Sequence, residues 1–403
     1  MKKVLIIGLG AQGSTIAKHL NEHPGVAQII CADNDHALAE RLAAALSKAL
    51  PMMADGRDPA SIIAAAQGCE LVVNGLPLEF NLNVMEAALE VGASYMDLSG
   101  PMEEIGFVES YQWLFSEWHE RFRTKGLLAL VGCGIAPGLA NVIVRESVEK
   151  LDSCDFIGIY FYDGFLSKHY VPFWWSPEVA LGDMMYKTFR TENGKIVTDE
   201  PFSRPVMMKF RGVEREIRMV DHEHDEPVTM GLLAQSVLKG ARDIEFKYGG
   251  PQVELAEHLY KIGLLCKDKV DVKGVMVAPF DVVMKQIPRA PRFDEEIQAV
   301  IDDGIIQDEG AFLVRLRGRV DGMERRIDCY TNFPGLEEAF ARARMTHESY
   351  STGQCAAVFS SLMVDGLCAE TGVIVPEQLN AECRHYVFEK LAKLDITVDE
   401  YQN

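Results

Sequence analysis

The stretch KVLIIGLGAQG, residues 3–13, decides the fold of the N-terminal part of the chain. Residues 3–7 form a short apolar run, typical of a strand that is buried on both faces of a sheet. The run leads directly into Gly8-x-Gly10-x-x-Gly13, and a helical pattern follows. A strand, this glycine spacing and a helix together indicate the phosphate-binding turn of a dinucleotide-binding fold.

Each glycine of this turn has its own expected role. Gly8 permits a tight turn, Gly10 lets backbone N–H groups approach a pyrophosphate, and Gly13 lets the helix pack closely on the strand. The intervening Ala11 and Gln12 are expected to contact the cofactor as well. The N-terminus of the helix adds a partial positive charge that favours phosphate.

A second strand, expected at residues 28–32, ends at Asp33, which lies twenty residues after Gly13. A carboxylate at this position can accept hydrogen bonds from the ribose hydroxyls of the adenosine. We therefore predict that Asp33 and Asn34 bind this end of the cofactor. The negative charge of Asp33, reinforced by Asp35, repels a 2′-phosphate, so NAD is favoured over NADP.

The alternation of strands and helices continues to residue 131. Helices are expected at 35–50, 81–90 and 109–124, and strands at 70–74, 94–97 and 127–131. This order predicts an α/β Rossmann domain, a doubly wound parallel sheet. Ligands of such sheets bind beyond the carboxyl ends of the strands. The strand ends predict these further cofactor contacts: Asn74, Gly75, Leu76, Pro77, Leu98, Ser99 and Gly134.

The junction GCGIAPG, residues 132–138, follows the last of these strands. Its three glycines suggest that a ligand approaches the backbone closely. Pro137 is expected to fix the first helical turn, and free N–H groups at the helix start are expected to hold a carboxylate or the nicotinamide end of the cofactor. Cys133, Pro137 and Gly138 are therefore predicted to contact the substrate. Cys133 is either a nucleophile or, as is commoner for a free cysteine, a buried thiol that packs near the nicotinamide.

The middle of the chain, residues 141–335, is expected to be an α+β substrate and dimerisation domain with a mixed sheet. Its strands are predicted at 154–164, 201–208, 216–220, 243–248, 311–318 and 325–330, and its helices at 177–191, 253–264 and 278–285. Residues 160–175 are rich in aromatic side chains. These side chains favour a sheet core, with a pocket wall or a subunit interface as the alternatives.

The loop DHEHDEP, residues 221–227, concentrates titratable side chains. Three interpretations remain open: a metal site, a solvated acidic loop, and a substrate-pocket loop. The His-x-His pair lacks an evident third zinc ligand, so no metal is predicted. In a pocket, His222 or His224 would titrate near neutrality.

The C-terminal part, residues 336–403, is expected to form helices that pack back on the first domain. Residues 345–367 are rich in small side chains, which allow a close approach between helices. The expected organisation is therefore a Rossmann domain at 1–140, the substrate domain at 141–335, and these C-terminal helices.

Four motifs together resemble the saccharopine dehydrogenase family. They are GLGAQG at 8–13, VVNGLPLEFN at 72–81, YMDLSG at 95–100 and GCGIAPGLANVI at 132–143. The resemblance continues through 175–197, 241–265 and 346–366, and the NAD-dependent L-lysine 6-dehydrogenases look most similar. Residues 220–231 depart from the lysine enzymes.

The resemblance implies an enzyme that removes a hydride from a carbon bearing an amine, which leaves an imine for water to hydrolyse. Such chemistry needs a base, and Asp97, His222 and Glu226 are the candidates. His224 would contact the substrate, and one arginine would hold its carboxylate: Arg190, the one we predict, with Arg215 and Arg218 as alternatives. Two alternatives stay open: a saccharopine- or opine-type enzyme that acts on a secondary amine, and a non-catalytic NAD-binding sensor.

Bulk composition narrows the partners. A formal charge of −20 argues against nucleic acid, and no apolar run approaches the length of a membrane span. Nine cysteines without a C-x-x-C pair fit the reducing cytoplasm. We expect a cytoplasmic homodimer with a small amino-acid substrate.

Overall fold

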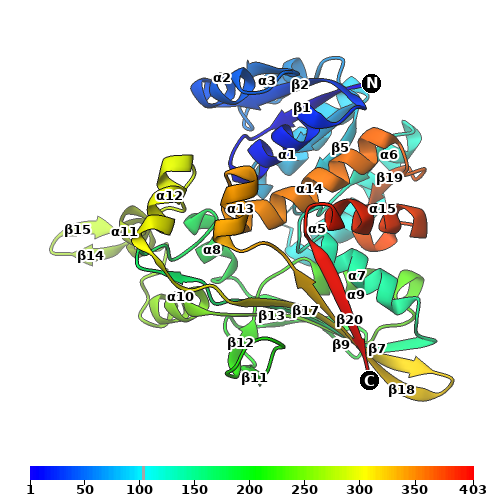
Figure 1. The fold of residues 1–403 in the computed structure, drawn as a ribbon, viewed down its shortest axis with the longest axis vertical. Coiled ribbons are helices and arrows are strands. Elements are labelled where there is room, and N and C mark those ends of the chain that lie inside the picture. The colour runs from blue at the N-terminus through cyan, green and yellow to red at the C-terminus, as the bar shows by residue number, and fades with distance from the viewer. Residues whose placement is uncertain (102–104) are drawn as a thin grey trace. The chain divides into compact units, whose positions relative to one another are not determined.

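The computed structural model describes residues 1–101 and 105–403, which form two compact units (Figure 1). The first unit comprises Met1–Lys150, Val228–Leu233 and Ser349–Thr397. The second unit comprises Leu151–Pro227, Ala234–Glu348 and Val398–Asn403.

The first unit contains a seven-stranded sheet in which every recorded pairing is parallel. The strand order is β19-β6-β5-β4-β1-β2-β3, so the direction of winding reverses between β1 and β4. The strands are β1 (Lys2–Ile7), β2 (Val26–Asp33), β3 (Ala49–Met53), β4 (Leu71–Asn74), β5 (Ser94–Asp97), β6 (Leu128–Leu130) and β19 (Gly372–Ile374). This topology confirms the predicted doubly wound α/β fold.

Helices connect these strands. They are α1 (Ala11–Glu22), α2 (His36–Ala44), α3 (Pro59–Ala66), α4 (Asn81–Val91), α5 (Phe107–Trp113), α6 (His119–Thr124), α7 (Leu139–Val148), α14 (His347–Asp365) and α15 (Ala381–Ala392). A π-helical segment, η2 (Leu114–Trp118), joins α5 to α6, and short 3₁₀ turns lie at η1 (Leu78–Phe80) and η3 (Pro376–Gln378). Four consecutive residues of β1, Val4 to Ile7, are fully buried, so both faces of the sheet are covered at its centre.

Two features of this sheet differ from the expectation. The predicted helix at 35–50 is wrong in its second half, because α2 ends at Ala44 and β3 follows. β3 is an edge strand in which Leu50 and Met53 are exposed, so it lacks the apolar run of a central strand. The seventh strand, β19, comes from the C-terminal part of the chain and pairs with β6.

The long helix α14 packs against α1 within the first unit. A Cβ atom added to Gly353 would lie 2.6 Å from Cγ2 of Thr15, so the two helices approach closely at this glycine. Nearby, the side chains of His19 and Gln354 are hydrogen-bonded at 2.9 Å. The small residues of α14 thus allow a C-terminal helix to return to the nucleotide-binding sheet, as the predicted fold class requires.

The second unit is built on a nine-stranded mixed sheet. The main strand order is β10-β9-β13-β7-β17-β18-β20, and β12 joins β13 and β11. β13 and β7 are parallel, whereas β17 is antiparallel to both β7 and β18. The strands are β7 (Ser153–Asp163), β9 (Thr188–Glu192), β10 (Lys195–Asp199), β11 (Val206–Met208), β12 (Ile217–Asp221), β13 (Asp243–Gly249), β17 (Gly310–Val320), β18 (Met323–Asn332) and β20 (Thr397–Gln402).

Smaller elements complete the second unit. β8 (Leu166–Ser167) pairs with β16 (Ile305–Gln307), and β14 (Val270–Val272) pairs with β15 (Val275–Val277). The helices are α8 (Pro177–Asp183), α9 (Glu226–Val237), α10 (Pro251–Lys261), α11 (Pro279–Gln286), α12 (Asp294–Asp303) and α13 (Leu336–Ala343). The mixed sheet with few helices confirms the predicted α+β character.

The aromatic stretch at 160–175 belongs largely to the core of the second unit. Tyr160 and Tyr162 pack in one buried cluster with Phe210. Phe165 and Trp174 pack in another, and their rings meet edge to face at 4.9 Å. These contacts confirm the core interpretation for the four side chains.

Two predicted elements of this unit are wrong. The helix expected at 177–191 stops at Asp183, because β9 begins at Thr188 and turns into β10 through Asn193 and Gly194, both with positive φ. The strand expected at 201–208 is confined to β11. Across the described residues, no helix combines the length and apolar character needed to cross a membrane.

Candidate cofactor and substrate sites

The glycine turn of the first unit is an open cradle of backbone. Gly8 has φ +86°, and an added Cβ would lie 2.7 Å from the backbone of Gly75 and Leu76. A Cβ on Gly13 would lie 1.9 Å from the carbonyl oxygen of Gly8. At Gly10, which precedes α1, a Cβ would meet nothing within 4 Å. Two glycines therefore serve packing, and Gly10 leaves a space in front of the helix N-terminus into which a pyrophosphate fits.

Asp33 lies at the end of β2, beside this cradle. Its Oδ2 accepts a hydrogen bond from the N–H of Leu9 at 2.7 Å, and its Oδ1 accepts one from the N–H of Asp35 at 2.9 Å. These bonds fix the carboxylate against the glycine turn, and each oxygen keeps a second lone pair that can accept a ribose hydroxyl. The side chain of Asp35 caps α2 by accepting a hydrogen bond from the N–H of Leu38.

A buried polar network ties together the carboxyl ends of β4, β5 and β6. Asn74 donates to Asn81 at 2.7 Å and to the hydroxyl of Tyr95 at 3.0 Å. Asp97 accepts from the hydroxyl of Tyr95 at 2.9 Å and from the N–H of Gly132 at 2.8 Å. Burial, followed by the charge of Asp97, raises the pKa of Tyr95, so this phenol stays protonated and donates.

Asp97 therefore positions strand ends. Its side chain is 1% exposed, and Asn81 donates to it as a third partner at 3.4 Å. A carboxylate that already accepts three hydrogen bonds in the interior has little capacity to take a proton from a substrate. The role of Asp97 as a base stays a prediction, and the geometry gives it less support than it gives the second unit's candidates.

The other predicted cofactor residues differ in accessibility. Gly10, Ala11, Asn34 and Pro77 are exposed, whereas Gln12, Gly75, Leu76, Leu98 and Ser99 are half-buried. Gly134 is buried. Gly8, Gly13 and Asn74 are buried as well, so the predicted cofactor residues that remain reachable are the exposed and half-buried ones.

The junction at 132–138 does not offer the free N–H groups that were expected. Gly138 donates to the side chain of Asn141 at 2.8 Å, and Leu139 donates to the carbonyl of Gly134 at 3.0 Å. Pro137 precedes the helix, whose N-cap is Gly138, so the expectation that Pro137 fixes the first helical turn is also wrong. Gly138 has φ +132°, and its Cβ would lie 2.0 Å from the carbonyl oxygen of Gly134. Close packing of the junction on itself accounts for this glycine.

Cys133 is a buried thiol in this junction. Its side chain is fully buried, and Sγ donates to the carbonyl of Leu130 at 3.6 Å. Burial, together with the charges of Asp97 and Glu377, raises the pKa of the thiol well above its usual range. A thiolate is the reactive form of cysteine, so these contacts favour packing over nucleophilic catalysis.

In the second unit, the loop between β12 and α9 gathers the titratable side chains that the sequence singles out. Nδ1 of His224 is hydrogen-bonded to Oε2 of Glu226, and the imidazole stacks on Phe246 with ring centroids 3.9 Å apart. The ring of His222 lies edge-on to Tyr248 at 5.2 Å. Strand β13, which carries both aromatic rings, therefore fixes the orientation of both histidines. We call His222, Glu223, His224, Asp225, Glu226 and Asp183 the acidic cluster.

Burial and charge repulsion raise the pKa values of two carboxyl groups in the acidic cluster. Burial, followed by the charges of Asp183, Asp225 and Glu226, raises the pKa of Glu223 well above its usual range. Burial raises the pKa of Asp183 to about 7, although the neighbouring His224 opposes the shift. Asp183 lies at the end of α8, forty residues before this loop, so only the fold reveals its membership.

The two histidines of the acidic cluster are driven in opposite directions. Burial and the proximity of His224 lower the pKa of His222 to about 3, so His222 is neutral. Burial would also lower the pKa of His224, but the carboxylates of Glu226, Asp225 and Asp183 outweigh it and raise that pKa. The raised pKa makes the His224 imidazole more basic, and its side chain is 21% exposed, so His224 is suited to accept a proton from a ligand.

Two carboxylate oxygens of the acidic cluster are buried without a hydrogen-bond partner among the described residues: Oε1 of Glu223 and Oε1 of Glu226. A buried carboxylate oxygen without a hydrogen bond destabilises the fold unless a ligand donates one. No group of three or more potential ligands in the described parts of the chain is arranged to hold a metal ion. The burial of Glu226 and Glu223 contradicts the alternative of a solvated loop.

Neutral polar groups adjoin the acidic cluster. Gln252, in α10, donates to the hydroxyl of Tyr248 at 2.7 Å, which leaves the phenolic proton of Tyr248 available to an acceptor. Burial and the nearby Asp163 raise the pKa of Tyr248, so the phenol remains protonated. Tyr248 and Gln252 were missed from the sequence, where only the end of a predicted strand, KYGG, marks them.

The sequence analysis predicted that Arg190 lies on a helix, and this prediction is wrong. Arg190 is on β9, where its guanidinium pairs with Asp199 at 2.6 Å and with Glu192 at 2.8 Å. Two carboxylates thus already occupy its hydrogen-bonding fork. The substrate contact of Arg190 stays a prediction. A substrate carboxylate would have to compete with Asp199 and Glu192 for the guanidinium.

Comparison with known proteins identifies the family. Residues 4–130 match the model of the saccharopine dehydrogenase NADP binding domain. The whole chain superposes on the whole of an L-glutamate-forming saccharopine dehydrogenase from Saccharomyces cerevisiae with a TM-score of 0.69 at 14% identity, which shows the same fold. Residues 4–130 therefore belong to the saccharopine dehydrogenase family. The chain is an NAD(P)-dependent dehydrogenase.

Two curated relatives of this chain have named activities. A carboxyaminopropylagmatine dehydrogenase of Synechocystis is 24% identical over 95% of this chain and 94% of its own length. A carboxynorspermidine synthase of Vibrio alginolyticus is 25% identical over 78% of this chain and 73% of its own length. The family predicted from the motifs is confirmed. The match to the NADP-binding domain supports a nicotinamide dinucleotide, the class of cofactor that the cradle fits.

Proposed function

We propose that this protein is an NAD-dependent dehydrogenase for a carboxylated secondary amine of the polyamine type. The acidic cluster is the observation that carries the proposal. Buried carboxylate oxygens of Glu223 and Glu226 have no hydrogen-bond partner in the described part of the chain, which favours a cationic ligand. An ammonium or guanidinium supplies several donors. The names of both relatives denote carboxylated amines of this kind.

The carboxylates and the histidine of the acidic cluster have different roles in this proposal. Glu223, Glu226 and Asp183 would hold the cationic end of the substrate. His224, oriented by Glu226 and stacked on Phe246, would take the proton from the reacting ammonium so that its lone pair can assist hydride departure. A nicotinamide dinucleotide held by the glycine turn at residues 8–13 and by Asp33 would supply the hydride acceptor. Water then adds to the resulting iminium, and the carbon–nitrogen bond breaks to give an amine and a carbonyl compound.

The choice of NAD rests on Asp33. Hydrogen bonds from Leu9 and Asp35 lock its carboxylate beside the cradle, where a 2′-phosphate would bring a second negative charge. No arginine or lysine is among the described hydrogen-bond partners of Asp33. We therefore favour NAD, with NADP as the outcome that would correct the proposal.

Initial-rate measurements with NAD and a panel of amines test the proposal. The panel contains carboxyaminopropylagmatine, saccharopine, L-lysine, and an analogue of the first in which an alkyl group replaces the guanidinium. We expect the highest kcat/KM for the carboxylated polyamine and at least a tenfold loss for the uncharged analogue, the usual cost of leaving a buried charge unpaired. Preference for L-lysine would favour oxidation of a primary amine. Equal rates for the charged and uncharged analogues would exclude the acidic cluster as the cation site.

A further inference from the structure

Two of the nine cysteines lie side by side in the first unit. The sulfur atoms of Cys368 and Cys383 are 3.7 Å apart and are hydrogen-bonded to each other. Cys368 follows the end of α14, whereas Cys383 lies in the first turn of α15, fifteen residues later in the chain. Neither cysteine belongs to the glycine turn or to the acidic cluster. A small movement of the two side chains would bring their sulfur atoms to bonding distance.

The start of α15 fixes the position of Cys383. The side chain of Asn380, the N-cap of this helix, accepts a hydrogen bond from the N–H of Cys383 at 3.0 Å. The thiol of Cys383 can also donate to the carbonyl of Leu367, at 3.6 Å, and Leu367 directly precedes Cys368. The N-terminus of a helix favours a thiolate over a thiol. The fold therefore holds one sulfur where a thiolate is stabilised and places the second sulfur next to it.

The two thiols share a proton when one of them ionises. Hydrogen bonding to Cys368 lowers the pKa of Cys383, and burial and two neighbouring glutamates oppose this shift without cancelling it. The same hydrogen bond, followed by burial, raises the pKa of Cys368. By comparison, burial raises the pKa of Cys31 to about 12. The pair therefore loses its first proton more readily than a buried cysteine such as Cys31.

A cavity of about 210 Å³ gives access to the pair from one side. Cys368 lines this cavity together with Ser94, Leu128 and Glu370. Cys383 is fully buried. A water molecule takes up about 30 Å³ in the liquid, so the cavity has room for a molecule as small as hydrogen peroxide. Such an oxidant meets Cys368 first.

We propose that Cys368 and Cys383 form a redox-active pair, which hydrogen peroxide oxidises to a disulfide that links the end of α14 to the start of α15. The sulfur of Cys368 attacks one peroxide oxygen, the O–O bond breaks and hydroxide leaves, while the thiolate of Cys383 takes the proton of Cys368. The thiol of Cys383 then attacks the sulfur of the resulting sulfenic acid. The S–O bond breaks, and the oxygen leaves as water with the thiol proton. The two sulfurs lose two electrons, which reduce the peroxide.

The disulfide closes a loop that contains the edge strand β19. Among the described strands, β19 pairs only with β6, through three residues. A bond that closes a loop of about fifteen residues stabilises a fold by restricting the unfolded chain. Oxidation should therefore hold β19 and the start of α15 on the sheet, and a thiol reductant should reverse this effect. The proposal is independent of the substrate, the cofactor and the proposed function.

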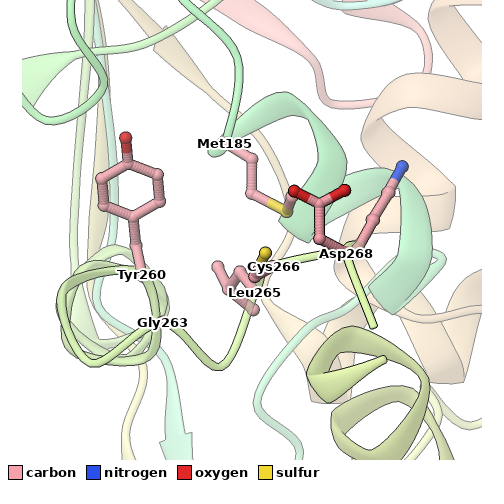
Figure 2. Close-up of a pocket in the computed structure, with 7 residues that line it drawn as sticks. Met185, Tyr260, Gly263, Leu265, Cys266 and Asp268 are labelled. Carbon is pink, nitrogen blue, oxygen red and sulfur yellow. The ribbon is translucent and has the colours of Figure 1, made fainter. Parts of the chain in front are cut away.

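Cys266 in the second unit is the matched control, because it also lines a cavity. It is exposed, and its cavity has a volume of about 370 Å³. Figure 2 shows Cys266 between Tyr260 and Asp268. The described residues that line this cavity include no second cysteine. Hydrogen peroxide should therefore convert Cys266 to a sulfenic acid that a dimedone reagent captures, without an internal disulfide.

Peptide mapping of the full wild-type chain, after a few equivalents of hydrogen peroxide, is the primary test. Proteolysis after glutamate separates the two cysteines, because Glu370 and Glu377 lie between them. A linked peptide that contains Cys368 and Cys383 is therefore expected before reduction and should disappear after it. Cys368→Ser and Cys383→Ser should each abolish the linked peptide and keep the circular dichroism spectrum of the wild type. Cys266→Ser should leave the linked peptide unchanged.

Thermal unfolding and amide exchange measure the consequence of the bond. Oxidation should raise the melting temperature by about 5–10 °C, and dithiothreitol should restore the original value. Amide exchange in residues 372–374 should slow. Cys383→Ser should show neither response, whereas Cys266→Ser should show both. A wild type without the linked peptide, a bond that joins two chains, sulfinic acid at Cys368 with Cys383 unmodified, or an unchanged melting temperature after the bond forms would each overturn the proposal.

Discussion

The glycine cradle and the acidic cluster bind by opposite means. The cradle consists of main-chain atoms. Gly8 and Gly13 allow segments of the backbone to pack closely, and the open space at Gly10 exposes the start of helix α1. The acidic cluster is built from charged side chains, and buried carboxylate oxygens of Glu223 and Glu226 find no hydrogen-bond partner within residues 1–101 and 105–403. Recognition of a phosphate by backbone N–H groups does not depend on the protonation of a side chain. A buried cluster of carboxylates changes its proton content with pH and with the charge of its ligand.

This difference teaches where specificity resides. Backbone N–H groups recognise a phosphate that every nicotinamide dinucleotide shares, so the cradle selects a class of cofactor. Carboxylates that repel one another, such as those of Asp183 and Glu223, favour the binding of a ligand with a localised positive charge. The cluster can therefore discriminate among amines, and variants in the two regions should affect different kinetic constants.

The largest effect is expected from Glu226→Gln in the acidic cluster. The change removes the charge that orients His224 and raises its pKa, so proton transfer should suffer. We expect kcat to fall by about 10²–10⁴, the usual range for general acid–base catalysis, with NAD affinity unchanged. Stopped-flow rates and cofactor titration measure the two quantities.

Glu192→Gln is the matched control for this variant, because Glu192 is an exposed residue at the end of β9 that pairs with Arg190. It should leave kcat within about threefold, as surface ion pairs contribute little. A Glu226→Gln enzyme with nearly full activity would remove His224 and Glu226 from the proposed chemistry.

The next effect is expected in the cradle. Gly10→Val places a side chain in the open space before α1, so NAD affinity should fall by at least a hundredfold, about 2.7 kcal/mol, while the fold persists. Gly13→Val is the contrasting variant, because its Cβ would lie 1.9 Å from a carbonyl oxygen and should destabilise the unit itself. Calorimetric NAD titration and thermal unfolding separate the two results. Normal NAD binding by Gly10→Val would show that the glycines only form a turn.

Asp33→Ala should have a smaller effect that is confined to cofactor choice. The wild type should bind NAD at least tenfold more tightly than NADP. Loss of the carboxylate should narrow that gap by about 1–3 kcal/mol, the range for a hydrogen bond to a charged group. Titration with both cofactors measures the gap. Equal affinities in the wild type would contradict the proposed role of Asp33.

The pH dependence of the acidic cluster should be smaller still. The pKa of Asp183 is raised to about 7 by burial, above its value in the unfolded chain. A raised carboxyl pKa stabilises the fold most at acid pH, and this contribution is lost as pH rises towards 7 and above. The melting temperature should therefore fall by a few degrees between pH 5 and pH 8.

A cationic ligand should reverse this loss, because deprotonated carboxylates bind it best. Agmatine, used as a probe, should raise the melting temperature more at pH 8 than at pH 5. Asp183→Asn should flatten both responses. An agmatine effect that is equal at the two pH values would show that the cluster holds its cation, if any, without a change of protonation.

The cradle could be predicted from the sequence because its contacts are local. Gly8, Gly10 and Gly13 are neighbours in the chain, and a strand on one side and a helix on the other fix their geometry. The acidic cluster was only half visible: the loop at 221–227 contains five of its members, but Asp183 reaches it through tertiary structure. Tyr248 and Gln252 were missed for the same reason. β19 was missed because a three-residue strand carries little pattern, although its pairing with β6 completes the sheet.

The smallest effect is expected from Cys133→Ser, at the junction where local pattern misled the prediction. Three glycines and a proline after a strand resemble an opening for a ligand, but the N–H groups of Gly138 and Leu139 are used within the junction and the thiol is fully buried. A serine hydroxyl can donate to the carbonyl of Leu130 as the thiol does. The variant should therefore lose only about 1 kcal/mol of stability, typical of one altered buried group, and keep kcat/KM within about twofold. Denaturant unfolding and initial rates measure the two. Loss of activity without loss of stability would indicate that Cys133 takes part in the reaction. The junction would then be a third functional region, in addition to the cradle and the acidic cluster.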